Sequence, residues 1–325
     1  MPPPPEIIIS CRRSDLAVVQ ARGIRAALES PPSSHSFRIV TGTAAADTDK
    51  TSPFAALLSK QSGGSDAGKS LWTNNLERDL VEGRAHVLVH CLKDMPTTLP
   101  AGCTLAAVTE REDPSDAVVM RSDAVWKEIG ELPPGSLVGS SSSRRRALVK
   151  RNWPHLEVAE CRGNLDTRLA KLDAPDSPFA CILLATAGLN RLGLAHRIKQ
   201  RLKPEEFPWA VGQGALGIEV VSEGRDDVAA LAVRVDHGPT RWMCLAERAM
   251  LRRLQGGCSS PVGVWTSLEG GRVRLRATVL NIEGTADLVV EEEAGVGGDE
   301  DAEGLGERVA DGLLKKGARD LLGKK

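Results

Sequence analysis

Cys258 stands in the segment RLQGGCSSPVG (253–263), between glycines and serines and shortly before a proline. A thiol in such a turn is sterically open, and the arginines that precede it favour the thiolate, which is the nucleophilic form of cysteine. The segment is therefore compatible with a nucleophile that carries a covalent group. An ordinary loop cysteine is the alternative, and composition alone favours that alternative.

Basic side chains form a second group of candidates, because they gather where predicted strands end. In the segment SSSSRRRALVK (140–150), serines that can cap a helix precede Arg144 and Arg145. Serine hydroxyls, free backbone N–H groups and guanidinium groups in one place form a receptor for a carboxylate or a phosphate. A solvated basic face is an equally good interpretation of this segment alone. Comparable residues follow other predicted strands, namely Arg12, Ser14, Arg162, Arg168 and Arg191.

Several arginines at successive strand ends favour a binding site for a polyanion, because the carboxyl ends of parallel strands face the crevice in which α/β folds bind ligands. The charge of the chain narrows the choice of ligand. The formal net charge is -1, whereas a domain that binds nucleic acid is expected to be basic. Basic residues are concentrated in 140–171 and absent from 277–307. This distribution favours a small anionic ligand over a polymer.

Lys93 and Asp94 lie together in the segment HCLKDMPTTLP (90–100), directly after a predicted strand. A carboxylate in this place can hold a cationic nitrogen or act as a general acid or base. A surface ion pair before a turn is the simpler interpretation of the segment alone. His86 and His90 share one face of the strand, but no cluster of other ligands completes a metal site around them. We therefore expect packed or hydrogen-bonded histidines and no metal.

The composition is typical of a globular protein with reduced cysteines. The chain has 325 residues, of which 41% are hydrophobic and 26% charged, and this length predicts two or three domains. Its 7 cysteines are odd in number and include no CxxC pair, which favours a reducing compartment over a disulfide framework or a zinc ribbon. Cys91 and Cys181 are expected to be small core residues. The N-terminus lacks the features of a targeting peptide, and no stretch approaches the roughly 18–20 apolar residues of a membrane span.

Short β-branched runs alternate with helical patterns, which predicts α/β domains with parallel sheets. Predicted strands cover 6–10, 36–40, 85–91, 104–109 and 116–120 in a first series, and 135–139, 156–161, 180–186 and 214–221 in a second. Predicted helices cover 15–30, 74–83, 141–153 and 164–172. A third unit is predicted as a helix at 240–255, strands at 272–280 and 286–293, an acidic loop at 298–304 and a helix at 307–322. The polar segment 41–70 is predicted to be a long functional or disordered loop.

Taken in their order along residues 6–266, these segments resemble the porphobilinogen deaminase family, also called hydroxymethylbilane synthase. Each motif alone is modest, but the ordered set is highly specific. The matching segments are RRSDLAVVQA, HCLKDMPTTLP, REDPSDAVV, VGSSSSRRRALV, RGNLDTRLAKLD, ILLATAGLNRLG, AVGQGALGIE and AERAMLRRLQGGCSSPVG.

The resemblance implies a transferase of tetrapyrrole and haem biosynthesis. In that family the cysteine of the GGC turn forms a thioether to a dipyrromethane cofactor, and Cys258 matches this cysteine. Porphobilinogen loses ammonia, and the bound chain attacks the resulting electrophile. Four such rounds and a hydrolysis release linear 1-hydroxymethylbilane. Asp94 matches the aspartate that contacts pyrrole nitrogens and stabilises positive charge, so it is the expected catalytic residue.

The resemblance also gives the other polar residues a role, because each pyrrole unit carries an acetate and a propionate that the arginines of the family bind. Gln213 falls in the hinge segment VGQGALGIE. The expected cofactor contacts are Cys258, Lys93, Asp94, Ser14, Ser142, Arg144, Arg145 and Arg162. The expected substrate contacts are Arg12, Arg168, Arg191 and Lys69, of which Lys69 lies beside a lid loop at 41–70.

Several positions depart from the pattern of the family, among them the segment TNNLERDL (73–80), which lacks the usual basic residue there. Cys91 stands in place of the usual serine before LKD, and Cys11 in place of a threonine. Ser143 replaces a leucine before the arginine pair, and Trp72 replaces a phenylalanine. None of these differences removes a charged group that was given a role above.

The implied fold is α/β in three domains, the first two like periplasmic binding proteins and the third a small α/β domain that carries the cofactor cysteine. The expected bounds are 5–113 plus 210–234 for domain 1, 114–209 for domain 2 and 235–325 for domain 3. The return of the chain to domain 1 is taken from the resemblance. We expect a cytoplasmic monomer that binds porphobilinogen and neither nucleic acid nor a membrane.

Two other classes of protein are rival interpretations. A non-catalytic binder of small polycarboxylates could keep the arginines but would not need both Asp94 and Cys258. A phosphate or RNA binder could use the basic segment 140–171. Such a protein would show a steep salt dependence, and the aromatic platforms expected of single-strand binders are missing from the sequence.

Overall fold

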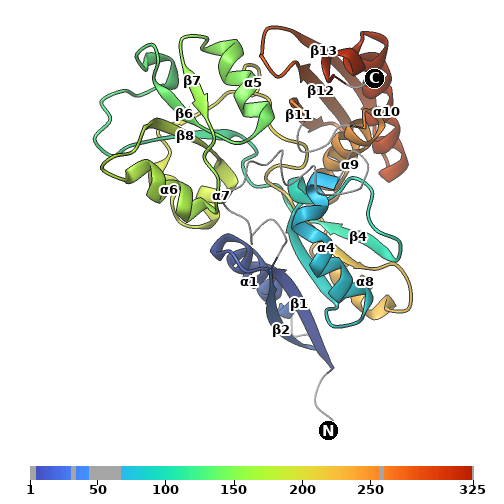
Figure 1. Cartoon of the computed structure of the whole chain (residues 1–325). Coiled ribbons are helices and arrows are strands. Elements are labelled where there is room, and N and C mark those ends of the chain that lie inside the picture. Colours follow the sequence, from blue (N-terminus) through green and yellow to red (C-terminus); the bar gives the residue numbers. More distant parts are fainter. Residues whose placement is uncertain (1–4, 31–33, 44–66, 256–259, 324–325) are drawn as a thin grey trace.

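Three β-sheets organise the chain. The computed structural model describes residues 5–30, 34–43, 67–255 and 260–323, and for 67–71 it describes the backbone alone. Within these residues two sheets have five strands each and one has three, and helices cover all of them (Figure 1). This arrangement confirms the expected α/β class, with two larger sheets and a third, smaller one.

The first sheet has the strand order β2-β1-β3-β10-β4. β1 is parallel to β2 and β3, whereas β10 runs antiparallel to β3 and β4. The chain leaves this sheet after β4 and returns for β10 once the second sheet is complete. Helix α1 covers the sheet because its apolar residues recur every three or four positions. The elements are β1 (Glu6–Arg12), β2 (Ser36–Gly42), β3 (Val87–Cys91), β4 (Cys103–Val108), β10 (Leu216–Val221), α1 (Asp15–Glu29), α4 (Ala67–Val81) and α8 (Asp226–Val233).

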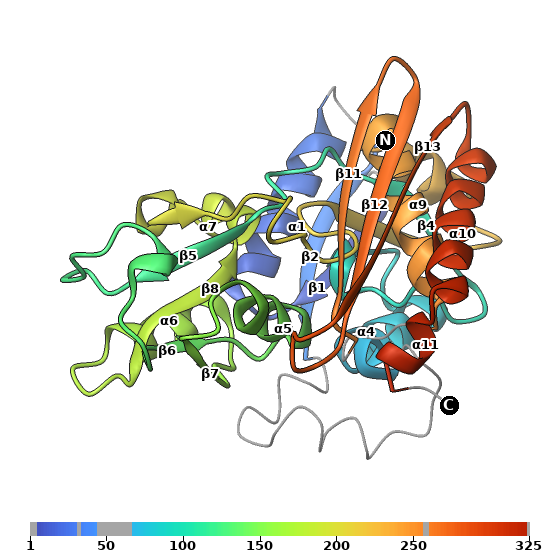
Figure 2. The same cartoon turned by 90° about the horizontal axis from the view of Figure 1, so that it is seen from above.

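The second sheet repeats this plan in the order β7-β6-β8-β5-β9. β6 is parallel to β7 and β8, and β5 runs antiparallel to β8. Helix α1 of the first sheet and α7 of the second are in contact (Figure 2). The elements are β5 (Asp116–Met120), β6 (Leu137–Gly139), β7 (Glu157–Ala159), β8 (Phe179–Ala185), β9 (Gln200–Arg201), α5 (Ser143–Asn152), α6 (Leu165–Asp173) and α7 (Thr186–Arg191).

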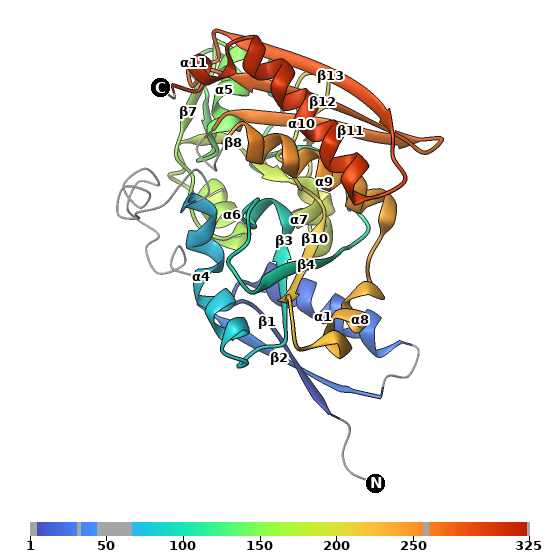
Figure 3. The same cartoon turned by 90° about the vertical axis from the view of Figure 1, so that its right-hand side faces the viewer.

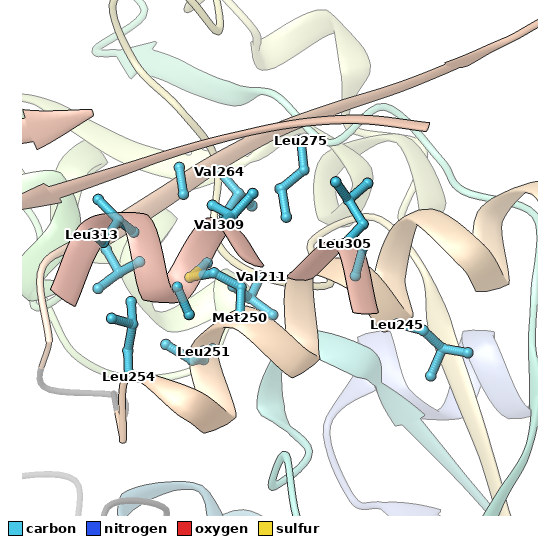
Figure 4. Packing of buried hydrophobic residues seen from close by; sticks show 14 of the residues in the cluster. Val211, Leu245, Met250, Leu251, Leu254, Val264, Leu275, Leu305, Val309 and Leu313 are labelled. Atoms are coloured by element: carbon cyan, nitrogen blue, oxygen red, sulfur yellow. The ribbon is translucent and has the colours of Figure 1, made fainter. Parts of the chain in front are cut away.

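The third sheet is antiparallel in the order β11-β12-β13, and helices α9 and α10 cover one of its faces (Figure 3). Val264 and Leu275 of the sheet meet Met250 of α9 and Val309 of α10 in a buried cluster (Figure 4). Burial of one such side chain stabilises the fold by about 1.5–3 kcal/mol. The elements are α9 (Gly238–Arg253), β11 (Val262–Glu269), β12 (Arg272–Leu280), β13 (Asp287–Gly295), α10 (Asp299–Lys315) and α11 (Ala318–Leu321).

The end of the chain differs from the prediction. The acidic segment 298–304, predicted as a loop, forms the first turns of α10. The carboxylates of Asp299, Glu300 and Asp301 lie at the N-terminus of this helix, where they interact favourably with the helix dipole. The helix predicted at 307–322 therefore begins earlier, as α10, and is divided from the short α11 at Gly317, whose φ of 94° favours glycine.

Other predictions of secondary structure were incomplete. The first two sheets are mixed and not parallel, because β10 and β5 run against their neighbours. Helix α4 begins at Ala67 and not at 74, and residues 44–66 of the predicted loop 41–70 lie outside the described residues. Helices α7 and α8 and strand β11 were not predicted. None of the helices in the described part of the chain combines the length and apolar character that a membrane crossing requires.

Glu247 of α9 joins three separate segments of the chain through buried hydrogen bonds. It is 0% exposed and accepts bonds from Arg111 Nη1 at 2.7 Å, from the backbone N–H of Gly212 at 2.7 Å and from Thr266 Oγ1 at 2.6 Å. Arg111 follows β4, Gly212 belongs to the segment that returns to the first sheet, and Thr266 lies in β11. One carboxylate thus connects segments that come from three parts of the chain.

We expect Glu247→Gln to lower the free energy of unfolding by about 3–5 kcal/mol, because it leaves the buried guanidinium of Arg111 without its counter-charge. Urea unfolding followed by circular dichroism measures this loss. Asp311→Asn, which breaks the exposed pair of Asp311 and Arg253, is the control and should change stability little. Equal losses in the two variants would contradict the importance given to the buried pair.

Candidate active site

A cavity of about 600 Å³ lies where the first two sheets meet, and the third domain contributes to its wall. The first sheet supplies the carboxyl ends of β1 and β3 and the start of α1. The second sheet supplies the starts of α5 and α6. The third domain supplies Leu251 of α9 and the residues Ser260 and Val262. The cavity thus lies at the strand ends where α/β folds bind ligands.

Most of the predicted site residues lie together in this cavity. Their positions agree with the expectation that strand ends from two sheets face one crevice. The predicted residues that line the cavity are Arg12, Ser14, Lys93, Asp94, Ser142, Arg144, Arg145, Arg162 and Arg168.

One predicted residue is placed differently, and the side chains of two others cannot be placed because they lie outside what the structure describes. Arg191, at the end of α7, is not among the lining residues and donates from Nη2 to the Gly214 carbonyl at 2.7 Å. Lys69 belongs to the first turn of α4, and its side chain lies outside the described residues. Cys258 also lies outside the described residues. However, Leu251 and Ser260, which stand on either side of Cys258 in the chain, both line the cavity.

Two helix starts place polar groups at the cavity. Ser14 caps α1 and accepts a hydrogen bond from the Ala17 N–H, and Ser142 caps α5 and accepts one from the Arg145 N–H. Serine is a preferred N-cap because its hydroxyl satisfies a backbone donor of the first turn. Arg144 and Arg145 therefore extend from the first turn of α5, where the helix dipole disfavours cations.

The electrostatics of the cavity favour a bound anion. Burial lowers the pKa of Lys93; nearby Asp94 opposes this shift and Arg145 adds to it. Burial, aided by Arg145, also lowers the pKa of Arg168 to about 10. These directions show that the cations are desolvated and repel one another. A ligand with several carboxylates would relieve both costs.

Two residues that line the cavity also carry a fully buried polar atom. Ser141 Oγ and Arg144 Nε are buried and have no hydrogen-bond partner among the described residues. Both residues line the cavity. A buried donor or acceptor without a partner costs about 1–3 kcal/mol, so these two side chains are strained by burial beside the cavity. Over the same residues, no group of three or more His, Cys, Asp or Glu side chains could hold a metal ion.

Asp94 lies at the carboxyl end of β3, in a single 3₁₀ turn formed by Leu92–Asp94. Its side chain is half-buried and lies at the cavity. Burial lowers the pKa of Lys93 and of Arg168, and the negative charge of Asp94 partly opposes this lowering at both residues. Asp94 is therefore a carboxylate among cations, placed where it can face a ligand.

Some residues of the site were missed or misjudged from the sequence. Trp72 lines the cavity, with its ring centroid 4.3 Å from Arg12 Cζ, which is within the range of a cation–π interaction. Cys91 was expected in the core but lines the cavity, where its Sγ accepts a hydrogen bond from Gln20 Nε2 at 3.2 Å. For the contact between Arg12 and Trp72, the sequence offered no signal other than the presence of the tryptophan. The Gln20 contact spans 71 residues and had no signal.

The expectations for the other residues of this region are confirmed. Cys181 is 0% exposed and packs in the core of the second sheet. His86 Nδ1 accepts a hydrogen bond from the Ile8 N–H at 3.0 Å. His90 Nε2 lies 3.2 Å from Glu219 Oε2 in a buried pair. Both histidines are therefore hydrogen-bonded or packed, as expected.

Glu77 of α4 lies beside this buried pair and is itself 3% exposed. Burial, and next Glu219, raise the pKa of Glu77 from 4.5 to about 7. A group whose pKa is raised in the folded protein contributes stability that is fully present below its unfolded pKa. That contribution is lost as the pH rises through about 7.

We expect Glu77→Gln to remove this pH dependence. Relative to the variant, the wild-type protein should lose about 3 kcal/mol of unfolding free energy between pH 4.5 and pH 8. Urea unfolding of both proteins at several pH values measures the difference. Glu82→Gln, at an exposed position just after α4, should keep the wild-type pH dependence. An identical pH dependence in the Glu77 variant and the wild-type protein would rule out the titration of Glu77.

The fold and the site define a class of protein: two α/β lobes with a cation-lined cavity at their junction and a third domain that contributes to its wall. Residues 7–229 match the family described as "Porphobilinogen deaminase, dipyromethane cofactor binding domain", and residues 242–315 match "Porphobilinogen deaminase, C-terminal domain". The chain belongs to the porphobilinogen deaminase family.

Similar proteins carry the same name over nearly their whole length. A porphobilinogen deaminase of Schizosaccharomyces pombe is 44% identical over 97% of this chain and 93% of its own. Those of Yarrowia lipolytica and of Synechococcus sp. strain CC9902 are 40% and 42% identical, each over 98% of this chain and over 93% and 95% of their own. Among solved structures, a nutrient binding protein from Burkholderia cenocepacia bound to methionine is similar with a TM-score of 0.41 and 11% identity, over 70% of this chain and 91% of that chain.

Proposed function

We propose that the chain is a hydroxymethylbilane synthase, that is, a porphobilinogen deaminase. It joins four molecules of porphobilinogen with loss of ammonia and releases linear 1-hydroxymethylbilane by hydrolysis, as a step of tetrapyrrole and haem biosynthesis. The observation that carries the proposal is the cavity, where Asp94 lies among arginines from two sheets. Family membership supports the choice of this reaction.

We propose that Cys258 holds the dipyrromethane cofactor through a thioether. The segment that contains Cys258 is flanked by Leu251 and Ser260, and both of them line the cavity. Ser14, Lys93 and Ser142 are the neighbouring contacts that would hold the cofactor. When bound, the cofactor supplies the free pyrrole position to which substrate units are added.

The arginines have the role of binding the carboxylates of the substrate and of the growing chain. Guanidinium groups bind carboxylates through two parallel hydrogen bonds, which fixes orientation as well as charge. Arg144, Arg145 and Arg162 would hold the cofactor, and Arg12 and Arg168 would hold incoming units. Arg191 and Lys69 stay predictions of the same kind, although Arg191 binds a backbone carbonyl in this structure.

Asp94 has the catalytic role. The substrate becomes positively charged as its amine leaves, and a carboxylate fixed beside a pyrrole N–H stabilises that charge. Because the carboxylate is already in place before the reaction, little reorganisation is needed when charge develops.

The remaining expectations are part of this proposal. The domain bounds are 5–113 plus 210–234, 114–209 and 235–325, which fits the membership of β10 in the first sheet. The protein would act as a cytoplasmic monomer on porphobilinogen, without nucleic acid or membrane as a partner. Sedimentation of the purified chain tests the monomer.

The activity is tested by incubating the purified full chain with porphobilinogen. We expect the release of ammonia and of a linear tetrapyrrole, and an intact mass that exceeds the mass of the chain by two pyrrole units. A protein that binds porphobilinogen tightly without turnover would instead be the non-catalytic binder. A protein that does neither would refute the proposal.

A further inference from the structure

A buried relay of polar side chains joins the two lobes at the back of the cavity. We call it the hinge relay, and all of its members except Asp116 line the cavity. Its central residues Asp116 and Gln213 are both 0% exposed. The members of the hinge relay are Lys93, Gln213, Asp116, Arg144 and Arg145.

Asp116, the first residue of β5, fixes the arginine pair of α5. Its Oδ2 accepts a hydrogen bond from Arg144 Nη1 at 2.7 Å, and its Oδ1 accepts bonds from Arg145 Nη2 at 2.7 Å and from Arg145 Nε at 3.1 Å. Burial alone would raise the pKa of Asp116, but the two guanidinium groups outweigh burial and hold that pKa well below its usual range. Asp116 is therefore a permanent anion that sets the orientation of both arginines.

Gln213 continues the relay into the first lobe. Its Nε2 donates to Asp116 Oδ1 at 2.9 Å and to the Pro114 carbonyl at 2.7 Å, and its Oε1 accepts from Lys93 Nζ at 3.2 Å. Gln213 belongs to the segment that crosses from the second sheet back to β10, between the two lobes. A movement of one lobe against the other must therefore stretch or break one of these hydrogen bonds.

The relay is more than a means of stabilising the fold, because it places more positive than negative charge at the cavity wall. One carboxylate balances two guanidinium groups, so the relay keeps a net positive charge. Arg144 Nε has no hydrogen-bond partner among the described residues. Burial lowers the pKa of Lys93, and the positive charge of Arg145 lowers it further. The lysine of the first lobe is therefore close enough to the arginine of the second lobe for the two charges to repel. A satisfied buried network of this kind holds its members in one geometry.

We propose that Asp116 and Gln213 are positioning residues that couple the lysine of the first lobe to the arginine pair of the second. The two halves of the cavity then bind the carboxylates of a substrate as one unit. This inference rests on the proposed function for its substrate, and it names two residues that act through others. Neither residue is expected to contact the reacting atoms.

The test is a double-mutant cycle in kcat and KM for porphobilinogen, with the variants Asp116→Asn, Gln213→Leu and the double variant. We expect each single change to raise KM by about 10-fold or more, and the double variant to be less than about 3-fold worse than the poorer single variant, because both changes break one relay. Asp116→Glu, which keeps the charge, should recover part of the loss. Ser115→Ala is the matched control, since the Ser115 hydroxyl pairs with Thr186 and not with the arginines, and its KM should stay within about 2-fold.

Two results would overturn the relay. In the first, the variants melt at a lower temperature but keep the wild-type KM. In the second, the increase in KM of the double variant equals the product of the increases in the two single variants. Turnover by the wild-type chain separately tests the proposed function. If the wild-type chain does not turn over porphobilinogen, the same proteins are titrated with citrate, a tricarboxylate whose binding needs no reaction. The relay predicts the same non-multiplicative loss of citrate affinity, and multiplicative losses would overturn it.

Discussion

Asp94→Asn is expected to lower kcat by about 100-fold to 1,000-fold, which is the usual loss when one preorganised electrostatic contact is removed. Asparagine has the same size and can still accept a hydrogen bond, but it cannot stabilise a positive charge through a full negative charge. The fold should not change, because Asp94 is half-buried at the cavity and lies in a short turn. Steady-state rates of porphobilinogen consumption measure the effect.

The matched control is Asp166→Asn, because Asp166 is an exposed carboxylate that lines the same cavity from the start of α6. If only the overall charge of the cavity matters, the two variants should lose similar activity. If the position of the carboxylate matters, the Asp166 variant should stay within about 3-fold of the wild-type kcat while the Asp94 variant does not. Near wild-type turnover by the Asp94 variant would remove Asp94 from the mechanism.

The grouping of basic residues around one cavity could be predicted from the sequence, because it follows from one general rule. Strand ends of an α/β sheet converge on one crevice, so Arg12, Lys93 and Arg162 could be placed together from their position after predicted strands. Their meeting in one cavity is a finding of the structure. Their roles in binding the cofactor and the substrate stay predictions until variants are measured.

The carboxylates that organise these cations could not be predicted in the same way. Asp116 lies 28 residues before Arg144 in the chain, and Glu247 lies 136 residues after Arg111. No periodicity links residues so far apart, because the contacts depend on how the lobes pack. In the sequence Glu247 is one acidic residue of a helix with several arginines, which is the pattern of a solvated face, yet it is fully buried.

Local composition was also misleading where two effects compete. The acidic segment 298–304 indicated a solvated loop, but its carboxylates stabilise the start of α10. The Gly306 backbone packs closely against Ala246 of α9, where a side chain would clash. Glycine destabilises an isolated helix. At Gly306, however, the missing side chain allows α10 to lie close to α9. Tertiary packing decided between helix and loop, and the sequence pattern alone did not contain that information.

Cys258→Ser is expected to abolish the covalent attachment of the cofactor and to reduce turnover by more than about 100-fold. Serine is a weaker nucleophile at neutral pH, since its hydroxyl is almost never ionised, whereas the thiolate is the reactive form of cysteine. The intact mass of the purified variant should equal the mass of the chain alone. Aldehyde reagents that colour pyrroles should give no signal.

Cys91→Ser is the control for this change, because Cys91 is a thiol that lines the cavity and stands close to Lys93 and Asp94 in the chain. Burial, aided by Asp94, raises the pKa of the Cys91 thiol, so Cys91 should remain a thiol and react poorly. The Cys91 variant should therefore keep the covalent cofactor and most of its activity. A Cys258 variant that still carries two pyrrole units, or a Cys91 variant that loses them, would move the attachment to a different sulfur and invalidate the assignment.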